Sequence, residues 1–213
     1  MEFGRLLEIV GEEPVFETAL LLAGEVDVRD VRRQLSRWAQ AGKLVQLRRG
    51  VYALAPPYQK VKPHPFMLAN RMGRGSYVSG QSALAHYGLI PEVTPVTVSV
   101  TPGRPGRWET PFGNFEFRHI KPALMYGYRL TGLGNGQEAF LASPEKALLD
   151  LVHLHPGADS PGYLRAARLQ NLGRLNLQEL QRLAEQSGFP KWKRAARLIA
   201  ELAQEESLEY KTP

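Results

Sequence analysis

The sequence of 213 residues contains no cysteine. Disulfide bonds and thiolate metal sites are therefore excluded, and a reducing cytoplasm is the expected location. Long apolar runs are also missing, because stretches such as residues 18–23 are far shorter than the roughly 20 residues of a transmembrane helix. The first residues are acidic and amphipathic, without the basic start of a secretory signal. We therefore expect no membrane segment and no disulfide framework.

The whole chain has an ordinary globular composition, with 43% hydrophobic and 23% charged residues. Acidic residues are nevertheless scarce in one stretch. Residues 28–62 contain nine basic residues against one acidic residue, a net charge of +8. The preceding residues 1–27 contain seven acidic residues against one basic residue, a net charge of −6. Such a change of sign within one small domain is typical of a protein that binds a polyanion. The alternative is a solvated basic surface without a partner.

Apolar residues at helical spacing predict three helices, over residues 2–10, between Pro14 and Gly24, and over residues 28–41. We expect Asp27 to cap the third helix and Asp30 to act as its capping-box carboxylate. Two short β-type runs follow within residues 44–54 and flank Arg49-Gly50, which predicts a hairpin. Three helices followed by a β-hairpin is the plan of a winged helix-turn-helix, which we expect over residues 1–58.

The third helix has an apolar and a basic face. The residues expected to pack inward are Val28, Val31, Leu35 and Trp38. The opposite face carries arginines, the residue type that reads guanine edges and grips phosphates. We predict that the unit binds double-stranded DNA through this face and through the hairpin. The predicted DNA-binding residues are Arg29, Arg32 at the edge of the face, Arg33, Ser36, Arg37, Lys43, Arg48 and Arg49.

A proline-rich linker around residues 56–65 separates this unit from a second domain, expected over residues 63–213. The predicted fold class is α+β, with a mixed α/β domain that ends in helices. The expected helices cover residues 65–71, 79–87, 143–153, 161–172, 176–187 and 190–206, and the expected strands cover residues 93–101, 112–120 and 138–142. We place residues 102–107 in a loop.

Ser143-Pro144-Glu145 is the start of a well-capped helix, in which Lys146 and Asp150 are expected to form a surface ion pair. Ser79 is similarly expected to cap the helix that follows it. The balance of motifs is against an enzyme, a cofactor or a metal site, because neither a nucleophile motif nor a clear ligand cluster stands out. An enzyme that uses carboxylates such as Asp150 with a divalent metal, a nuclease or nucleotidyltransferase, is the alternative.

Further basic residues lie outside the first domain. Arg104, Arg107 and Arg118 surround a loop, where we favour a solvated surface. A second set on the last helix comprises Lys191, Lys193, Arg194 and Arg197. For this set, a solvated face, a nucleic-acid contact and a contact with an acidic protein stay open. We expect the neighbouring Trp192 to belong to the core.

Three strings resemble a known family. They are LRRGVYAL at residues 47–54, YVSGQSALAHYGLI at residues 77–90 and ASPEKALLD at residues 142–150. Together, in this order and spacing, they resemble the AbiEi-type antitoxins of bacterial type IV toxin–antitoxin systems. The strings span about residues 44–153, and the helices after them resemble the family only in being helical.

The resemblance implies two linked activities. The winged helix would bind inverted repeats in the promoter of its own operon and repress transcription. The second domain would neutralise a nucleotidyltransferase-like toxin, an activity that in this family often needs no stable complex. A solitary winged-helix regulator without a toxin is the alternative.

Overall fold

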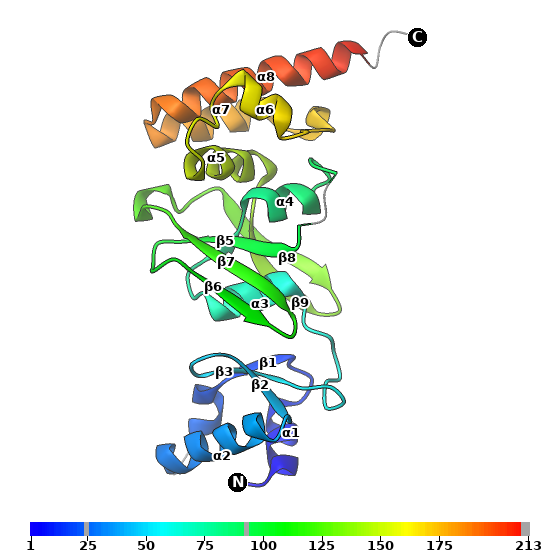
Figure 1. Cartoon of the computed structure of the whole chain (residues 1–213), viewed down its shortest axis with the longest axis vertical. Helices are drawn as coiled ribbons and strands as arrows, with labels where there is room; N and C mark the ends of the chain where they lie inside the picture. The colour runs from blue at the N-terminus through cyan, green and yellow to red at the C-terminus, as the bar shows by residue number, and fades with distance from the viewer. Residues whose placement is uncertain (24–25, 92–93, 210–213) are drawn as a thin grey trace.

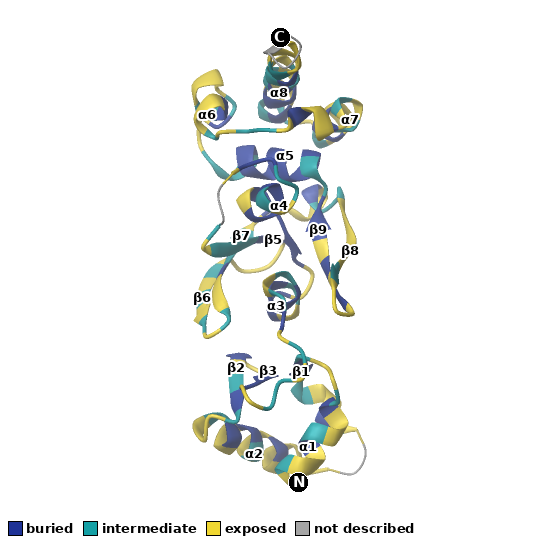
Figure 2. Ribbon diagram, turned by 90° about the vertical axis from the view of Figure 1, so that its right-hand side faces the viewer, coloured by how far each residue is buried: buried dark blue, intermediate teal, exposed yellow. Residues whose placement is uncertain are grey.

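The computed structural model of the chain describes residues 1–23, 26–91 and 94–209 (Figure 1). These residues form eight α-helices and two β-sheets, which confirms the expected mixture of helices and strands. The molecule is elongated and has three layers: residues 1–58, a six-stranded sheet with its helices, and a layer of C-terminal helices (Figures 1 and 2). We call residues 1–58 the N-terminal unit and the rest the second unit. The expected domain boundaries stay a prediction.

The N-terminal unit contains α1 (Phe3–Val10), β1 (Val15–Glu17), the 3-10 helix η1 (Thr18–Leu22), α2 (Val28–Gln40), β2 (Leu44–Arg48) and β3 (Val51–Leu54). The hairpin of β2 and β3 is confirmed, and β1 joins it on the other side of β3 in an antiparallel sheet of order β1-β3-β2.

The second predicted helix is wrong in its first part. Phe16 lies in β1, where its ring stacks on Tyr52 of β3 at 5.9 Å, and only residues 18–22 are helical. Gly24, the expected end of this helix, lies outside the described residues. The run after Pro14 is too short for periodicity to separate strand from helix, and a partner strand distant in sequence decided the outcome.

Helix α2 forms where its cap predicts. The Asp27 carboxylate accepts hydrogen bonds from the backbone N–H groups of Arg29 and Asp30, at 2.7 and 3.4 Å. The Asp30 carboxylate does not close a capping box but pairs with Arg33. Val28 was expected in the core and is 40% exposed, because residues 26–30 all project into solvent at the first turn. Val31, Leu35 and Trp38 are buried as predicted, in one cluster with Leu6 of α1 and Leu44 of β2.

The second unit begins with α3 (Pro65–Met72), β4 (Tyr77–Val78), α4 (Gly80–His86), β5 (Val96–Thr101), β6 (Gly106–Thr110), β7 (Gly113–His119), the 3-10 helix η2 (Pro122–Leu124), β8 (Tyr128–Gly134) and β9 (Gln137–Ala142). The strands form one mixed sheet of order β6-β7-β5-β4-β9-β8, in which the short β4 is central. Helix α3 covers the side of the sheet that faces the N-terminal unit, and α4 lies on the other side (Figures 1 and 2).

The C-terminal layer contains α5 (Pro144–Leu154), α6 (Pro161–Ala166), the 3-10 helix η3 (Leu172–Arg174), α7 (Leu177–Ser187) and α8 (Pro190–Glu209). Helix α5 contacts α4, α7 and α8, so it joins the sheet layer to the helical layer. The helix expected over residues 161–172 ends at Ala166, because Arg168 and Asn171 have φ of 51° and 55°, outside the helical region. No helix of the described residues combines the length and apolar composition that a membrane span requires.

In the second unit, the strands that the sequence did not predict are β4, β6 and β8. Both β6 and β8 are edge strands, and most of their residues are exposed or half-buried. An edge strand without a buried face lacks the alternation by which a strand is recognised. Strand β6 begins inside the segment expected to be a loop. The predicted strand over residues 93–101 begins only at Val96, and its first residue is outside the described range.

The linker between the units is tied to the sheet. The buried Gln137 side chain of β9 accepts a hydrogen bond from His64 N at 2.7 Å and donates one to Lys62 O at 3.0 Å. Apolar residues of the N-terminal sheet, Val15 and Leu47 among them, belong to the same buried cluster as Met72 of α3. A continuous apolar contact therefore joins the two units.

His64 makes the stability of this joint depend on pH. Its Nδ1 accepts a hydrogen bond from Phe66 N at 3.1 Å and caps α3, which requires a neutral ring. Burial, and then the neighbouring His86, lower the pKa of His64 below the ordinary 6.5. The pKa of His64 is therefore lower in the folded protein than the 6.5 of the unfolded chain. Neutral His64 stabilises the folded state fully above pH 6.5, and this stabilisation is lost as the pH falls through the folded pKa.

We therefore expect the free energy of unfolding to fall on acidification from neutral pH. The His64→Asn variant keeps a capping side chain that does not titrate, so its stability should depend less on pH between neutrality and pH of about 5. Chemical unfolding curves at several pH values measure this. An equal pH dependence in the variant and the parent would contradict the role of His64.

Candidate nucleic-acid interface

The outer face of α2 is basic and open to solvent. Arg29, Arg33, Ser36 and Arg37 are all exposed and share the side of the helix opposite the buried Val31 and Leu35. This helix lies at the end of the molecule farthest from the second unit's helical layer (Figure 1). The structure thus brings together four of the eight predicted site residues on one convex surface.

Only one arginine of this face is paired within the described residues, and the pairing is weak. Arg33 forms an ion pair with Asp30 one turn earlier, and each side chain is 63% exposed. Exposed pairs of this kind contribute about 0–1 kcal/mol, so an incoming phosphate can replace Asp30 at little cost. Lys43 is half-buried, and its ammonium lies 4.7 Å from the centre of the Phe3 ring.

Arg48 and Arg49, next to each other at the turn between β2 and β3, have different surroundings. Gly50 has a φ of +81°, a conformation that favours glycine and allows the tight reversal. Arg49 is exposed at this turn. Arg48 instead donates a hydrogen bond from Nη1 to Met72 O at 2.6 Å, and its guanidinium lies 5.3 Å from the centre of the Trp108 ring. The geometry of Arg48 therefore supports a contact between the units and gives no support for a DNA contact.

Three further arginines that the sequence did not single out as DNA-binding lie near Arg32 and Arg49. They are Arg71, Arg74 and Arg104, which line one cleft with them. These residues come from separate elements of the second unit, and no local pattern relates them to α2. Only the packing of the two units brings them together.

Several other basic residues of the second unit have intramolecular partners. Arg107 and Arg118 both pair with Glu116, at 3.2 and 2.5 Å. On α8, Lys191 Nζ donates to His155 O at 2.6 Å and Arg194 pairs with Asp159 at 2.7 Å. These pairings favour a structural role for Arg107, Arg118, Lys191 and Arg194. Trp192 is fully buried, which confirms its expected place in the core.

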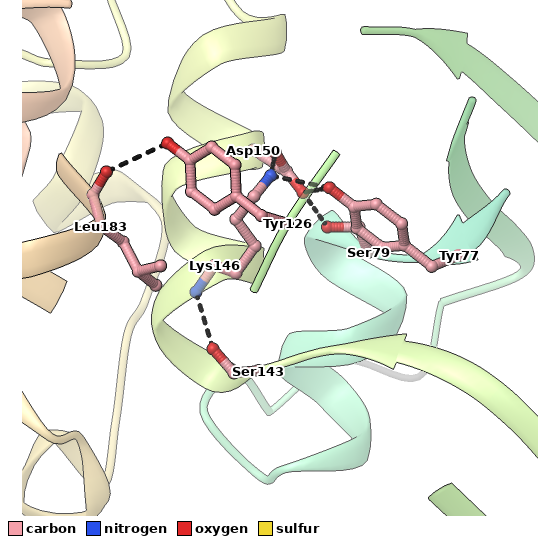
Figure 3. Close-up of polar contacts among 7 residues, drawn as sticks. All are labelled: Tyr77, Ser79, Tyr126, Ser143, Lys146, Asp150 and Leu183. Atoms are coloured by element: carbon pink, nitrogen blue, oxygen red, sulfur yellow. Dashed lines mark hydrogen bonds and ion pairs between the residues drawn. The ribbon is translucent and has the colours of Figure 1, made fainter. Parts of the chain in front are cut away.

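A buried polar cluster lies between the sheet and the helical layer (Figure 3). Lys146 and Asp150 of α5 form an ion pair, and neither side chain is exposed to solvent. The Asp150 carboxylate also accepts hydrogen bonds from Ser79 Oγ at 2.7 Å and from the Tyr77 hydroxyl at 3.0 Å. Lys146 Nζ donates to the Tyr77 hydroxyl at 2.7 Å and lies 5.1 Å from the centre of the Trp192 ring.

This cluster corrects two predictions. The Lys146–Asp150 pair was expected on the surface, but the packing of α5 under α8 and against the sheet removes it from solvent. Ser79 stands at the expected N-cap position, but its hydroxyl donates to Asp150 and makes no capping hydrogen bond. Ser143 caps α5 as predicted, because its Oγ accepts from Lys146 N at 3.2 Å.

Burial dominates the electrostatics of the cluster. It lowers the pKa of the Lys146 ammonium, and the Asp150 carboxylate partly offsets this effect. Burial, followed by the charge of Asp150, raises the pKa of the Tyr77 phenol far above its usual range. Since these groups have no exposure, a substrate cannot reach them in this conformation, and the cluster is best understood as structural.

The described residues contain no group of three or more histidine, aspartate or glutamate side chains arranged to hold a metal ion. Neither protein-family models nor curated proteins give a match for this chain. The resemblance to AbiEi-type antitoxins therefore rests on the three sequence strings alone.

The buried pair generates a prediction about stability. Lys146→Met leaves the Asp150 carboxylate buried without its counter-ion, which should lower the free energy of unfolding by about 3–5 kcal/mol. The double variant Lys146→Met/Asp150→Leu removes both charges and should be more stable than the single variant. Denaturant unfolding of the three proteins measures these differences. A single variant as stable as the parent would contradict the importance of the pair.

Proposed function

We propose that this protein is a DNA-binding transcriptional repressor whose N-terminal unit is a winged helix-turn-helix. The observation that carries the proposal is the exposed arginine face of α2. The order of elements supports it, since a short helix and a longer basic helix precede the hairpin of β2 and β3. In such units the second of these helices enters the major groove, and its first turns contact the base edges.

The dimensions of α2 suit this role. Its 13 residues span about 20 Å at 1.5 Å per residue, and B-DNA offers a major groove about 12 Å wide that admits one helix. Arg29, Arg33 and Arg37 follow one another at intervals of four residues and so point in the same direction. Such a row can place one guanidinium on a base and others on the flanking phosphates.

The antitoxin part of the proposal rests on the family resemblance. In this proposal the protein represses its own operon at inverted repeats of double-stranded DNA. It also neutralises a nucleotidyltransferase-like toxin through the second unit. The proposal requires a cytoplasmic location, which the absence of cysteine also favours.

Two alternatives are separated by simple observations. A solitary regulator would lack a toxin gene beside its own gene. A DNA-directed nuclease or transferase would need accessible carboxylates, but Asp150, the carboxylate considered for it, is buried against Lys146. We therefore propose a protein without enzymatic activity or a cofactor.

DNA binding is tested by a mobility-shift assay with duplex DNA from upstream of the gene. Several phosphate contacts should make the affinity fall steeply with salt, with a slope of about −0.9 per phosphate on logarithmic axes. Arg33→Ala/Arg37→Ala should weaken DNA binding by about 1–3 kcal/mol for each of the two arginines that contacts a base edge. An arginine that contacts a phosphate instead should, when removed, reduce the slope of affinity against salt.

The matched control is Arg5→Ala on α1. Arg5 resembles Arg33, because it is 66% exposed and pairs with a carboxylate, Glu8, three residues away, but it lies outside the proposed interface. Its removal should leave the affinity nearly unchanged. Unaltered binding by Arg33→Ala/Arg37→Ala would exclude α2 as the recognition helix, and the absence of any salt-sensitive binding would exclude the repressor.

The antitoxin activity is tested by co-expression with the toxin of a neighbouring gene, with both genes under foreign promoters so that repression plays no part. The full-length Arg29→Ala/Arg33→Ala/Arg37→Ala variant should relieve growth arrest as well as the parent, because neutralisation is assigned to the second unit. The full chain is used because apolar residues of the N-terminal unit complete the core of the second. Growth arrest that persists with the parent protein would contradict antitoxin activity.

A further inference from the structure

A cleft of about 570 Å³ lies between the N-terminal unit and the second unit. One wall comprises η1, the turn between β2 and β3, and the edge of α2. The other comprises the end of α3, the segment after it, and the loop between β5 and β6. Six arginines line the cleft against one acidic residue, Glu17. They are Arg32, Arg48, Arg49, Arg71, Arg74 and Arg104.

The positive charge of this cleft is not balanced. Glu17 already pairs with Arg74, Arg71 pairs with Glu13 at 4.0 Å, and Arg48 is held by Met72 O and Trp108, so three of the six arginines have partners. In the part of the chain that the structure describes, Arg32, Arg49 and Arg104 form no ion pair or hydrogen bond. A concave surface with charges of one sign concentrates the electrostatic field and attracts the opposite charge. Arginine is the side chain best suited to bind phosphate there.

The floor of the cleft is apolar and firmly packed. Met72 and Phe117 are buried, and the half-buried Trp108 packs edge-on against Phe117 with ring centres 5.2 Å apart. At Gly73 a Cβ atom would lie 2.2 Å from the Phe117 ring, so only glycine allows the backbone to pack this closely. Of these two rings only Trp108 offers exposed aromatic surface, and it shares that ring with Arg48, whose guanidinium lies 5.3 Å from its centre.

This combination fits a small phosphorylated ligand better than duplex DNA. The volume lies within the roughly 300–1,000 Å³ of small-molecule sites, which often occupy the boundary between two domains. A duplex whose major groove alone is about 12 Å wide cannot enter it. Several unpaired arginines can together bind more than one phosphate group. The exposed part of Trp108 can make apolar contact with a base.

We propose that the cleft binds a nucleotide with two or more phosphates. The phosphates are held by Arg32, Arg49 and Arg104, and the base contacts the floor at Trp108. The ligand joins residues of both units, so it stabilises their present arrangement. If the proposed function holds, the nucleotide also withdraws Arg32 and Arg49 from DNA and thereby weakens DNA binding.

Isothermal titration calorimetry of the full chain without DNA tests the site. The probes are inorganic phosphate, pyrophosphate, ATP and GTP. We expect one molecule bound per chain, with pyrophosphate tighter than phosphate and at least one nucleotide tighter than pyrophosphate. Arg49→Ala/Arg104→Ala should weaken the binding of pyrophosphate and nucleotide about tenfold or more, because charge-assisted arginine–phosphate contacts are lost.

Two controls separate this site from other basic surfaces. Arg165→Ala removes an exposed arginine of α6 that pairs with Glu205, and Arg33→Ala/Arg37→Ala removes the outer face of α2. Both should bind the probes as the parent does. Failure of DNA binding with intact probe binding would leave the cleft proposal standing and reject only the proposed function.

Three results would overturn the proposal. The first is the absence of saturable binding of any probe at millimolar concentrations. This holds even if Arg49→Ala/Arg104→Ala weakens the binding of duplex DNA, because the arginines would then serve DNA binding alone. The second is an equal loss of binding in the control variants, which indicates non-specific attraction of anions. The third is that neither ATP nor GTP binds more tightly than pyrophosphate, because the base would then make no favourable contact with the floor of the cleft.

Discussion

Lys146 and Asp150 form an ion pair without exposure to solvent, and three parts of the second unit meet at it. Tyr77 and Ser79, at β4 in the centre of the sheet, bond to the carboxylate, and Trp192 of α8 packs against the ammonium. A buried charge without these partners would be strongly destabilising. The helical layer therefore cannot shift against the sheet without breaking the hydrogen bonds that join the pair on α5 to Tyr77 and Ser79, and these bonds hold the two layers in register.

The contact between the units has a different character. It combines apolar residues of the N-terminal sheet, such as Leu47, with the Arg48 side chain, which reaches the backbone of Met72 and the ring of Trp108. The sheet of the N-terminal unit thus faces inward, and the basic side of α2 faces outward (Figure 2). This orientation leaves the proposed DNA-reading face uncovered.

The basic charge of the chain is divided between two surfaces of opposite shape. The convex face of α2 carries Arg29, Arg33 and Arg37 and suits a long groove of DNA. The cleft beside it is concave and has an aromatic floor, which suits a compact anion. Arg32 lies at the edge between the two, so a ligand in the cleft and DNA on the helix would compete for the same side chain.

The local elements of the N-terminal unit could largely be predicted from the sequence. The Asp27 cap, the apolar spacing in α2 and the turn at Arg49-Gly50 depend on residues close together in the chain, where side-chain chemistry is sufficient. The same local chemistry predicted the arginine face of α2 and the cap of α5 by Ser143.

Contacts between residues distant in sequence decided the rest. Strand β1 exists because Phe16 meets Tyr52, and the edge strands β6 and β8 carry no buried face that a pattern could reveal. The same four-residue spacing of Lys146 and Asp150 would suit a surface pair, and only the packing of α8 and β4 makes it a buried one. Arg48 and Arg49 are neighbours with the same chemistry, yet the second unit engages only Arg48.

The sequence by itself determined which side chains carry charge and where the well-capped helices α2 and α5 begin, because these depend on local spacing. The tertiary structure alone decided which charges are buried, paired or left facing a cleft, because burial depends on what the rest of the chain places against them.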